Sequence, residues 1–223
     1  GAGLAREPVD IVGSDPAFLQ YTGGTTGLSK GACLSHRNLV ANTMQFRAVI
    51  GRALGDGDDV IVTALPLYHI FALMVSLVAY GSAGAESWLV ANPRDLDGLA
   101  DLMKAARPTA FAGVNTLYAG LGANKRLGDV DFSRLRFAVG GGSSILPSTA
   151  ARWKAVTGTV ICEGYGLSET SPVLTLNPPG LGEFSGTTGV PLPGTDIVLL
   201  GEGDREVAVG ETGEVCAKGP QVM

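Results

Sequence analysis

The stretch YTGGTTGLSKG, residues 21–31, gathers glycines, threonine hydroxyls and one lysine directly after an apolar run. Glycines let backbone N–H groups converge on one anion, the hydroxyls add donors, and Lys30 supplies a positive charge, which together suit a polyphosphate. The stretch is not a Walker A loop, because Ser29 precedes Lys30 and Gly31 follows it. Such a stretch is also typical of an ordinary surface loop, so the rest of the chain must decide.

A second candidate is an isolated histidine, His69, which follows LPLY and precedes the uncharged stretch IFALMVSLVAY at residues 70–80. A lone histidine in this setting is more often a core residue than a catalytic one. The apolar stretch is shorter than the roughly 20 residues that a membrane-spanning helix needs. We therefore expect a core helix here and no transmembrane segment.

The elements that must position these residues alternate between strand and helix patterns. Strands are expected at residues 17–22, 60–65, 87–91, 109–114, 137–141 and 159–165. Helices are expected to begin at Ser35, at Asp95 and at Pro147. The alternation predicts an α/β fold with a parallel or mixed sheet flanked by helices. Ligands of such sheets bind outside the carboxyl ends of strands, where we place residues 21–31.

The helix that begins at Ser35 is expected to run to Ile50 and to stop at Gly51. We expect its apolar positions Leu39, Val40 and Met44 to face the core.

The pattern changes from about residue 182, where helical periodicity gives way to β runs and Gly-rich turns. We predict an α/β core for nucleotide and acyl binding at residues 1–181, and a β-rich appendage, the start of a β subdomain, at residues 182–223. Both ends lie inside patterned sequence, so we expect the chain to be the central part of a larger protein.

Composition excludes some partners. The formal charge of −5 argues against nucleic acid, since no stripe of Lys and Arg could displace counterions. The cysteines Cys33, Cys162 and Cys216 have neither disulfide nor metal-ligand spacing. We interpret them as buried free thiols of a reducing cytoplasm.

Four ordered motifs resemble those of the AMP-forming acyl-CoA synthetases, also called adenylate-forming enzymes. These motifs are YTGGTTGLSKGACLSHRN, LPLYHIFAL, AVGGGSSI followed by EGYGLSETSP, and GEVCAKGPQVM. Together they span nearly the whole chain. Within this family the chain is most similar to bacterial long-chain fatty acid–CoA ligases, through the spellings YTGGTTG, NPRD, GVNTLY and KGPQVM.

The resemblance implies a reaction in two steps and the large N-terminal domain of the family as the fold. A fatty carboxylate attacks the α-phosphorus of ATP, giving acyl-AMP and pyrophosphate, and the thiol of coenzyme A then displaces AMP. It implies ATP and Mg²⁺ as cofactors, with coenzyme A as a co-substrate. No protein nucleophile is needed, because catalysis rests on positioning and on cancelling charge between two anions.

The resemblance also assigns residues. Those assigned to catalysis are His69, Ser168, Glu169 and Lys30, and those assigned to Mg²⁺ are Thr22 and Glu169. Those assigned to the nucleotide are Thr22, Gly23, Gly24, Thr25, Thr26, Gly27, Lys30, Gly141, Gly142, Glu163, Gly164, Tyr165 and Gly166. The family usually has threonine where this chain has Ser168, and proline where it has Ser29.

Substrate class can be narrowed from charge. Relatives that activate amino acids need a buried acid to pair the substrate ammonium, and no acidic residue lies between Asp59 and Glu86. An apolar acid is favoured, while an aryl or medium-chain acid remains an alternative. Val114 and its neighbours are expected to wall the acyl site, although core packing is nearly as good an interpretation.

A hypothesis of another class is that the chain alone binds nucleotide without catalysis. The family's ribose-binding aspartate, hinge and adenylation lysine are expected beyond KGPQVM. Isolated, the chain is expected to be inactive and to self-associate through uncovered surfaces. Peripheral membrane contact is an expectation for the full-length protein only.

Overall fold

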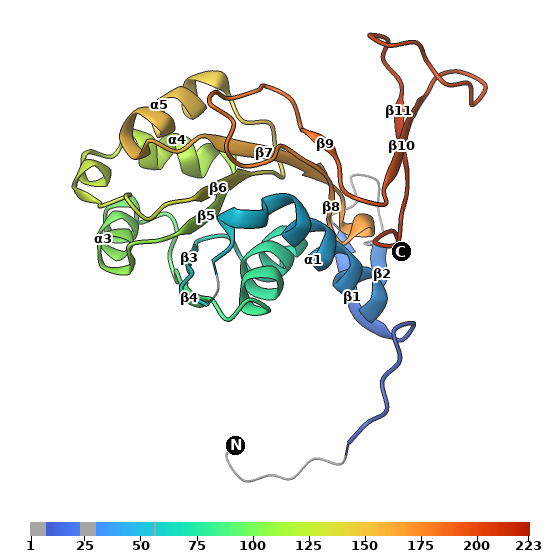
Figure 1. The fold of residues 1–223 in the computed structure, drawn as a ribbon, viewed down its shortest axis with the longest axis horizontal. Helices are drawn as coiled ribbons and strands as arrows, with labels where there is room; N and C mark the ends of the chain where they lie inside the picture. Colours follow the sequence, from blue (N-terminus) through green and yellow to red (C-terminus); the bar gives the residue numbers. More distant parts are fainter. Residues whose placement is uncertain (1–7, 23–29, 56) are drawn as a thin grey trace.

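The structure, a computed structural model, describes residues 8–22, 30–55 and 57–223. At its centre is a seven-stranded sheet in the order β4-β3-β5-β6-β7-β8-β9 (Figure 1). The strands are β3 Val60–Thr63, β4 Glu86–Leu89, β5 Ala110–Gly113, β6 Phe137–Gly140, β7 Ile161–Gly166, β8 Val173–Leu176 and β9 Val190–Pro191. Strands β4, β3, β5, β6 and β7 run parallel, whereas β8 and β9 are antiparallel to their neighbours. The α/β class with a mixed sheet is therefore confirmed.

Helices cover both faces of this sheet. They are α1 His36–Ile50, α2 Ile70–Ala72, α3 Leu96–Ala106, α4 Asn115–Ala123 and α5 Pro147–Thr157. Helix α2 continues as a π-helix, η2 Leu73–Ala79, and short 3₁₀ turns lie at η1 Gly51–Ala53, η3 Lys125–Asp129 and η4 Ser168–Thr170. Within the described residues, no helix is both long and apolar enough to cross a membrane.

Alternate residues of the strands feed two cores, as expected for a sheet buried on both faces. Val62 and Phe111 pack with α3, α4 and α5, while their neighbours Ile61 and Ala110 pack with α1 and η2. The expected helix signals also hold: Ser35 caps α1, Asp95 caps α3, and Gly158 ends α5 with a positive φ of 73°.

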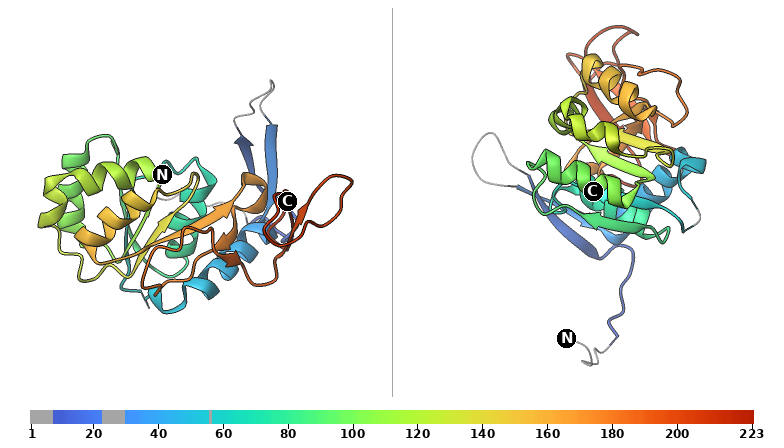
Figure 2. Two further views of the ribbon diagram at one scale, coloured as in Figure 1. Left: turned by 90° about the horizontal axis from the view of Figure 1, so that it is seen from above. Right: turned by 90° about the vertical axis from the view of Figure 1, so that its left-hand side faces the viewer.

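Two antiparallel hairpins lie outside the sheet (Figure 2). The first joins β1 Pro16–Thr22 to β2 Lys30–Ser35, and the second joins β10 Asp196–Leu200 to β11 Glu214–Lys218. The placement of residues 21–31 after a strand of the parallel sheet is therefore wrong. The physical reason is that KGACLS is itself a strand, with Ala32 and Leu34 buried on one side, so it pairs back onto β1.

Helix α1 turns a different face inward from the one its apolar residues predicted. Leu39 is buried, but Val40 and Met44 are 58% and 67% exposed. The buried face carries Asn42, Gln45 and Phe46 instead, because its amides bind backbone of the C-terminal half of the chain.

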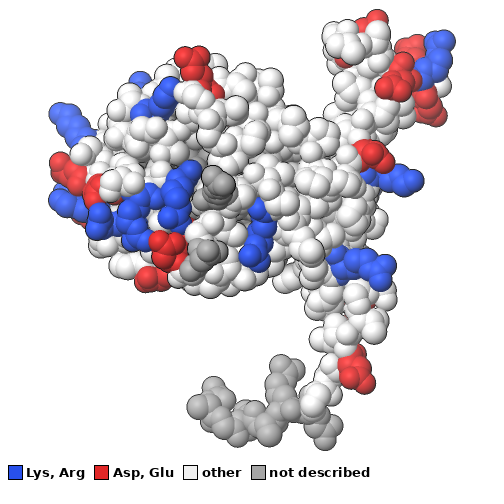
Figure 3. All heavy atoms as spheres, in the orientation of Figure 1, with Lys and Arg blue, Asp and Glu red and all other residues white. Residues whose placement is uncertain are grey.

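The C-terminal part of the chain is only partly separate from the sheet. Strand β9 pairs with β8 although it lies beyond residue 182, whereas the β10–β11 hairpin projects from the body (Figure 1). Acidic side chains gather on that hairpin in Figure 3, where residues 196–218 include Glu202, Asp204, Glu206 and Glu211.

The three cysteines are free thiols, as predicted. Cys162 is buried, and burial raises the pKa of its thiol to about 11, so it stays protonated at neutral pH. The expected burial is wrong for Cys33, which is exposed on β2, and Cys216 is half-buried.

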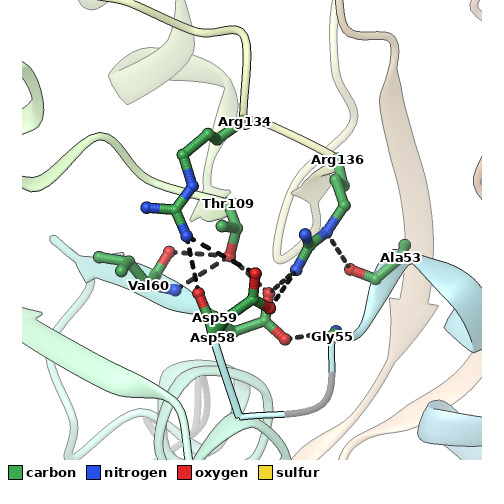
Figure 4. Close-up of polar contacts among 8 residues, drawn as sticks. All are labelled: Ala53, Gly55, Asp58, Asp59, Val60, Thr109, Arg134 and Arg136. Carbon is green, nitrogen blue, oxygen red and sulfur yellow. Dashed lines mark hydrogen bonds and ion pairs between the residues drawn. The ribbon is translucent and has the colours of Figure 1, made fainter.

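A buried polar cluster ties together the amino ends of three parallel strands (Figure 4). The carboxylate of Asp59, just before β3, accepts from the hydroxyl of Thr109 at 2.6 Å and from Arg136 Nη2 at 2.5 Å. It also accepts from the backbone N–H of Gly55 at 2.6 Å. Thr109 precedes β5 and Arg136 precedes β6, so the carboxylate of Asp59 joins the starts of three strands. This cluster therefore lies at the amino ends of the parallel strands.

Candidate functional site

A cavity of about 330 Å³ opens at the carboxyl ends of β6 and β7, beside the start of α2. The ends of β6 and β7 line it with Gly141, Gly142, Gly164, Tyr165 and Gly166. Thr22, His69, Ser168 and Glu169 line it from other segments. The structure thus brings together residues that lie as far apart in the sequence as Thr22 and Glu169.

Glycines keep the cavity open and its walls close. A Cβ at Gly141 would lie 3.4 Å from the ring of Phe71 and 3.5 Å from the carbonyl oxygen of Gly164. A Cβ at Gly166 would lie 1.8 Å from the carbonyl oxygen of Pro172, which no side chain can satisfy. A Cβ at Gly164 would lie 3.0 Å from the carbonyl oxygen of Thr175, so backbone approach favours glycine at both glycine positions of EGYG, whereas at Gly141 the contacts would be ordinary.

The loop that carries Ser168 and Glu169 is closed by its own hydrogen bonds. The N–H of Leu167 donates to the carbonyl of Pro172 at 3.1 Å and to the hydroxyl of Thr170 at 3.0 Å. The same hydroxyl donates to the carbonyl of Pro172 at 2.5 Å. Thr170 is buried at the base of the loop, whereas Glu169 is half-exposed and lines the cavity.

Helix α1 holds this loop from one side. The buried amide of Asn42 donates to the carbonyl of Val173 at 2.7 Å and accepts from the N–H of the same residue at 3.0 Å. The C-terminal tail holds it from the other side, because the N–H of Met223 donates to the carbonyl of Glu169 at 3.0 Å. Asn38, also on α1, donates to the carbonyl of Val222 at 2.9 Å and so fixes that tail.

Replacing Asn42 by leucine is expected to destabilise the protein by about 2–6 kcal/mol, since two buried backbone groups of Val173 lose their partners at about 1–3 kcal/mol each. The thermal unfolding midpoint measures this loss. Val40→Ala, on the exposed face of the same helix, is the control and is expected to change stability by less than about 0.5 kcal/mol. Equal changes in the two variants would contradict the role of Asn42.

His69 caps the start of α2, where its Nδ1 accepts from the N–H of Phe71 at 3.3 Å. An accepting Nδ1 carries no proton, so the neutral ring carries its proton on Nε2. The imidazole is exposed and lines the cavity, so it can donate to an oxygen bound there.

Two of the residues predicted for catalysis or nucleotide binding are described by the structure but lie outside the cavity lining. Glu163 is buried, and its carboxylate accepts from the N–H of Ile145 at 2.9 Å, so it supports the loop after β6 rather than facing the cavity. Lys30 is exposed on β2, paired across the hairpin with Thr22. The predicted Gly23, Gly24, Thr25, Thr26 and Gly27 lie outside the described residues.

One end of the cavity is apolar, and its residues were not predicted. They are Phe46 from α1, Val75 from η2, Val139 from β6, and Val173 and Leu176 from β8. A signal in the sequence existed for two of them only: Val75 lies in the apolar run after His69, and Val139 lies in the predicted strand at residues 137–141. Val114 is not among the lining residues and instead packs against the core beneath α3, α4 and α5.

The oxygen donors of the cavity suit a hard cation. Glu169 supplies a carboxylate and Thr22 a hydroxyl to the same cavity. Over residues 8–22, 30–55 and 57–223, no group of three or more His, Cys, Asp and Glu side chains could hold a metal. A site with so few protein ligands is compatible with Mg²⁺, because this ion keeps several waters and binds largely through substrate phosphates.

Comparison with known proteins identifies the family. The family model described as AMP-binding enzyme matches residues 3–223. The chain belongs to the AMP-binding enzyme family. Among AMP-binding enzymes, the long-chain-fatty-acid–CoA ligase of Salmonella typhimurium is 47% identical over 214 residues. That match covers 96% of this chain and 38% of the relative, so the chain spans about two fifths of the length of that relative.

Other AMP-binding enzymes are similar at lower identity. Feruloyl-CoA synthase from Amycolatopsis is 34% identical over 97% of this chain and 44% of that protein. The crystal structure of ATP-bound MatB from Rhodopseudomonas palustris superposes with a TM-score of 0.85 at 35% identity, over 98% of this chain and 42% of that one. A benzoate CoA ligase from Burkholderia xenovorans superposes with a TM-score of 0.83 at 29% identity, over 95% and 42%.

Proposed function

We propose that the whole protein is a long-chain fatty acid–CoA ligase and that this chain supplies its nucleotide and acyl site. The observation that carries the proposal is the cavity itself. Polar groups of Thr22, His69 and Glu169 meet an apolar end within one space, which fits a carboxylate that must meet a phosphate. The 47% identity to a long-chain-fatty-acid–CoA ligase supports the same activity.

The reaction has two steps, and each step forms one bond and breaks another. In the first step a carboxylate oxygen bonds to the α-phosphorus of ATP, and the bond to the bridging oxygen breaks, so pyrophosphate leaves with the electron pair. In the second step the sulfur of coenzyme A bonds to the acyl carbon, the bond from that carbon to the phosphate oxygen breaks, AMP leaves with the electron pair, and the thiol proton passes to solvent. Because both reactants of the first step are anions, the site must align them and offset their charge.

The residues of the cavity divide this work. The Nε2–H of His69 can donate to a carboxylate or α-phosphate oxygen. The hydroxyl of Thr22 and the charge of Lys30, which pair across the hairpin, are expected to act on the phosphates. Tyr165 offers a ring against which adenine can stack. The other predicted phosphate contacts remain predictions: Gly23, Gly24, Thr25, Thr26 and Gly27.

Glu169 and Thr22 would hold Mg²⁺ in this proposal. When bound, the ion supplies positive charge that offsets the phosphate oxygens. The closed loop around η4 and the bond from the N–H of Met223 hold the backbone of Glu169, so its side chain starts from a fixed piece of backbone in the cavity wall. A carboxylate on a held backbone would place the bound ion, whose positive charge is the preorganised charge that electrostatic catalysis requires.

The apolar end of the cavity supports an apolar acid. Glu169 is the one carboxylate among the described residues that line the cavity, and the end formed by Phe46, Val75 and Leu176 carries no charge. A substrate ammonium or a second carboxylate would be buried there without a partner, at a high cost in free energy. The long chain is favoured over an aryl acid by sequence identity, 47% against 34%.

ATP–pyrophosphate exchange by the whole protein tests the proposal with a series of acids: palmitate, oleate, dodecanoate, hexanoate, benzoate, ferulate and malonate. We expect the largest kcat/KM for palmitate, oleate or dodecanoate. A preference for benzoate or ferulate would replace the long-chain substrate with an aryl acid. ATP binding without exchange for any acid would favour nucleotide binding without catalysis.

Lys30→Ala is expected to weaken ATP binding by about tenfold and AMP binding by less than about twofold, because an exposed charged hydrogen bond to the outer phosphates is lost. Calorimetric titration of each nucleotide measures the two dissociation constants. Lys125→Ala, an exposed lysine on η3, is the control and should leave both constants unchanged. Equal losses for ATP and AMP would place Lys30 away from the outer phosphates.

A further inference from the structure

The inner face of the β1–β2 hairpin carries a polar side chain next to the cavity. Gln20 and Thr22 lie two residues apart on β1, so their side chains point to the same side of the strand. Both are half-buried. By contrast, Leu19, which precedes Gln20, is 63% exposed, and Tyr21, which lies between Gln20 and Thr22, is 65% exposed. Thr22 lines the cavity, and Gln20 is its neighbour on that face.

Gln20 reaches the turn that carries His69. Its Nε2 donates to the carbonyl oxygen of Tyr68 at 2.9 Å, joining segments 48 residues apart. That turn is itself closed by the N–H of His69, which donates to the carbonyl of Pro66 at 3.0 Å. The turn leads directly into α2, so the amide of Gln20 binds a fixed piece of backbone.

Below this contact the hairpin rests on apolar side chains. Ala32 and Leu34 of β2 pack with Ile70 and Leu73 of α2 and η2. Apolar contact of this kind is non-directional, so it holds the hairpin against the helix without fixing its angle. A hydrogen bond has a preferred length and direction, so the bond from Gln20 can fix that angle.

We propose that Gln20 is a positioning residue that sets the place of Thr22 relative to His69 in the cavity wall. The inference rests on the proposed function, because the two positioned residues act there on ATP and the carboxylate. Gln20 itself touches neither reactant. Its effect is transmitted through the hairpin, since a small rotation about the apolar base moves the end of β1 most.

Gln20→Met in the whole protein tests this, because methionine keeps the volume but cannot donate. We expect the dissociation constant of ATP to rise about threefold to tenfold, the factor that a neutral hydrogen bond supports, while AMP binding stays within about twofold. The unfolding midpoint should move by less than about 2 °C, because the bond lies at a partly exposed rim. Leu19→Met, on the outer face of the same strand, should change none of these quantities.

A double-mutant cycle with Thr22→Val separates positioning from general weakening. If Gln20 acts through the place of Thr22, the double variant should lose ATP affinity by little more than the larger single loss. Additive losses, or equal losses of ATP and AMP, would overturn the inference. Failure of the proposed function would be distinguishable, because the unaltered protein would then show no ATP binding or no exchange.

Discussion

Glu169→Gln is expected to lower ATP–pyrophosphate exchange by at least about a hundredfold, since the carboxylate would hold Mg²⁺, whose positive charge at the phosphates contributes several kcal/mol. Glutamine keeps the size of the side chain and removes only its charge. The fold should survive, because the loop is held through backbone groups: Met223 binds the carbonyl of Glu169, and Asn42 binds Val173. The measurement is the initial rate of exchange at saturating ATP and palmitate.

Magnesium dependence distinguishes a metal ligand from other roles of Glu169. If the carboxylate binds the ion, the concentration of Mg²⁺ that gives half-maximal exchange should rise in the variant. Glu183→Gln, at an exposed glutamate outside the cavity, is the control and should behave as the unaltered protein does. An unchanged rate and an unchanged magnesium dependence in Glu169→Gln would remove this residue from the site.

The meeting of the glycine motifs could be predicted because it follows from the fold. AVGGGSS ends one parallel strand and EGYG ends the next, and carboxyl ends of adjacent parallel strands share one edge of the sheet. The alternation of strands and helices is therefore enough to predict that Gly141 lies near Gly164. Their residue types then pointed to close backbone approach.

The hairpin could not be placed in the same way. A run such as AFLQYT has no property that distinguishes a strand of the large sheet from one arm of a separate hairpin. The pairing depends on the strand KGACLS, in which apolar and polar residues alternate only weakly. The sequence pattern therefore did not identify this segment as the partner of β1. The link from Gln20 to Tyr68 was hidden for the same reason, since it exists only when the hairpin folds over α2.

Helix α1 illustrates a limit of apolar periodicity. Its core-facing side carries Asn38, Asn42 and Gln45, which recur at helical spacing and bind backbone from residues 173–222. Polar residues usually mark the solvent side, so the pattern predicted a face that is right for Leu39 and wrong for Val40 and Met44. Only the location of distant backbone groups, which no local window contains, makes buried amides favourable here.

Asp59→Asn is expected to lower the free energy of unfolding by about 3 kcal/mol, at the low end for breaking a buried ion pair, because Arg136 stays partly hydrated. The side chain of Asp59 is fully buried, whereas that of Arg136 is 34% exposed. Asparagine keeps the shape but cannot accept from Gly55, Thr109 and Arg136 together (Figure 4). For a chain of this size the unfolding midpoint should fall by about 6–12 °C.

Asp58→Asn is the matched control, because the adjacent carboxylate contacts Arg136 at 3.3 Å but its side chain is 64% exposed. An exposed pair contributes at most about 1 kcal/mol, so this midpoint should fall by no more than about 4 °C. In both variants, exchange per folded molecule should be unchanged, since the cluster joins the amino ends of β3, β5 and β6 while the cavity lies at the carboxyl ends. Similar small shifts of the unfolding midpoint in Asp58→Asn and Asp59→Asn would contradict the inference that the buried carboxylate of Asp59 stabilises the fold by joining the three strands.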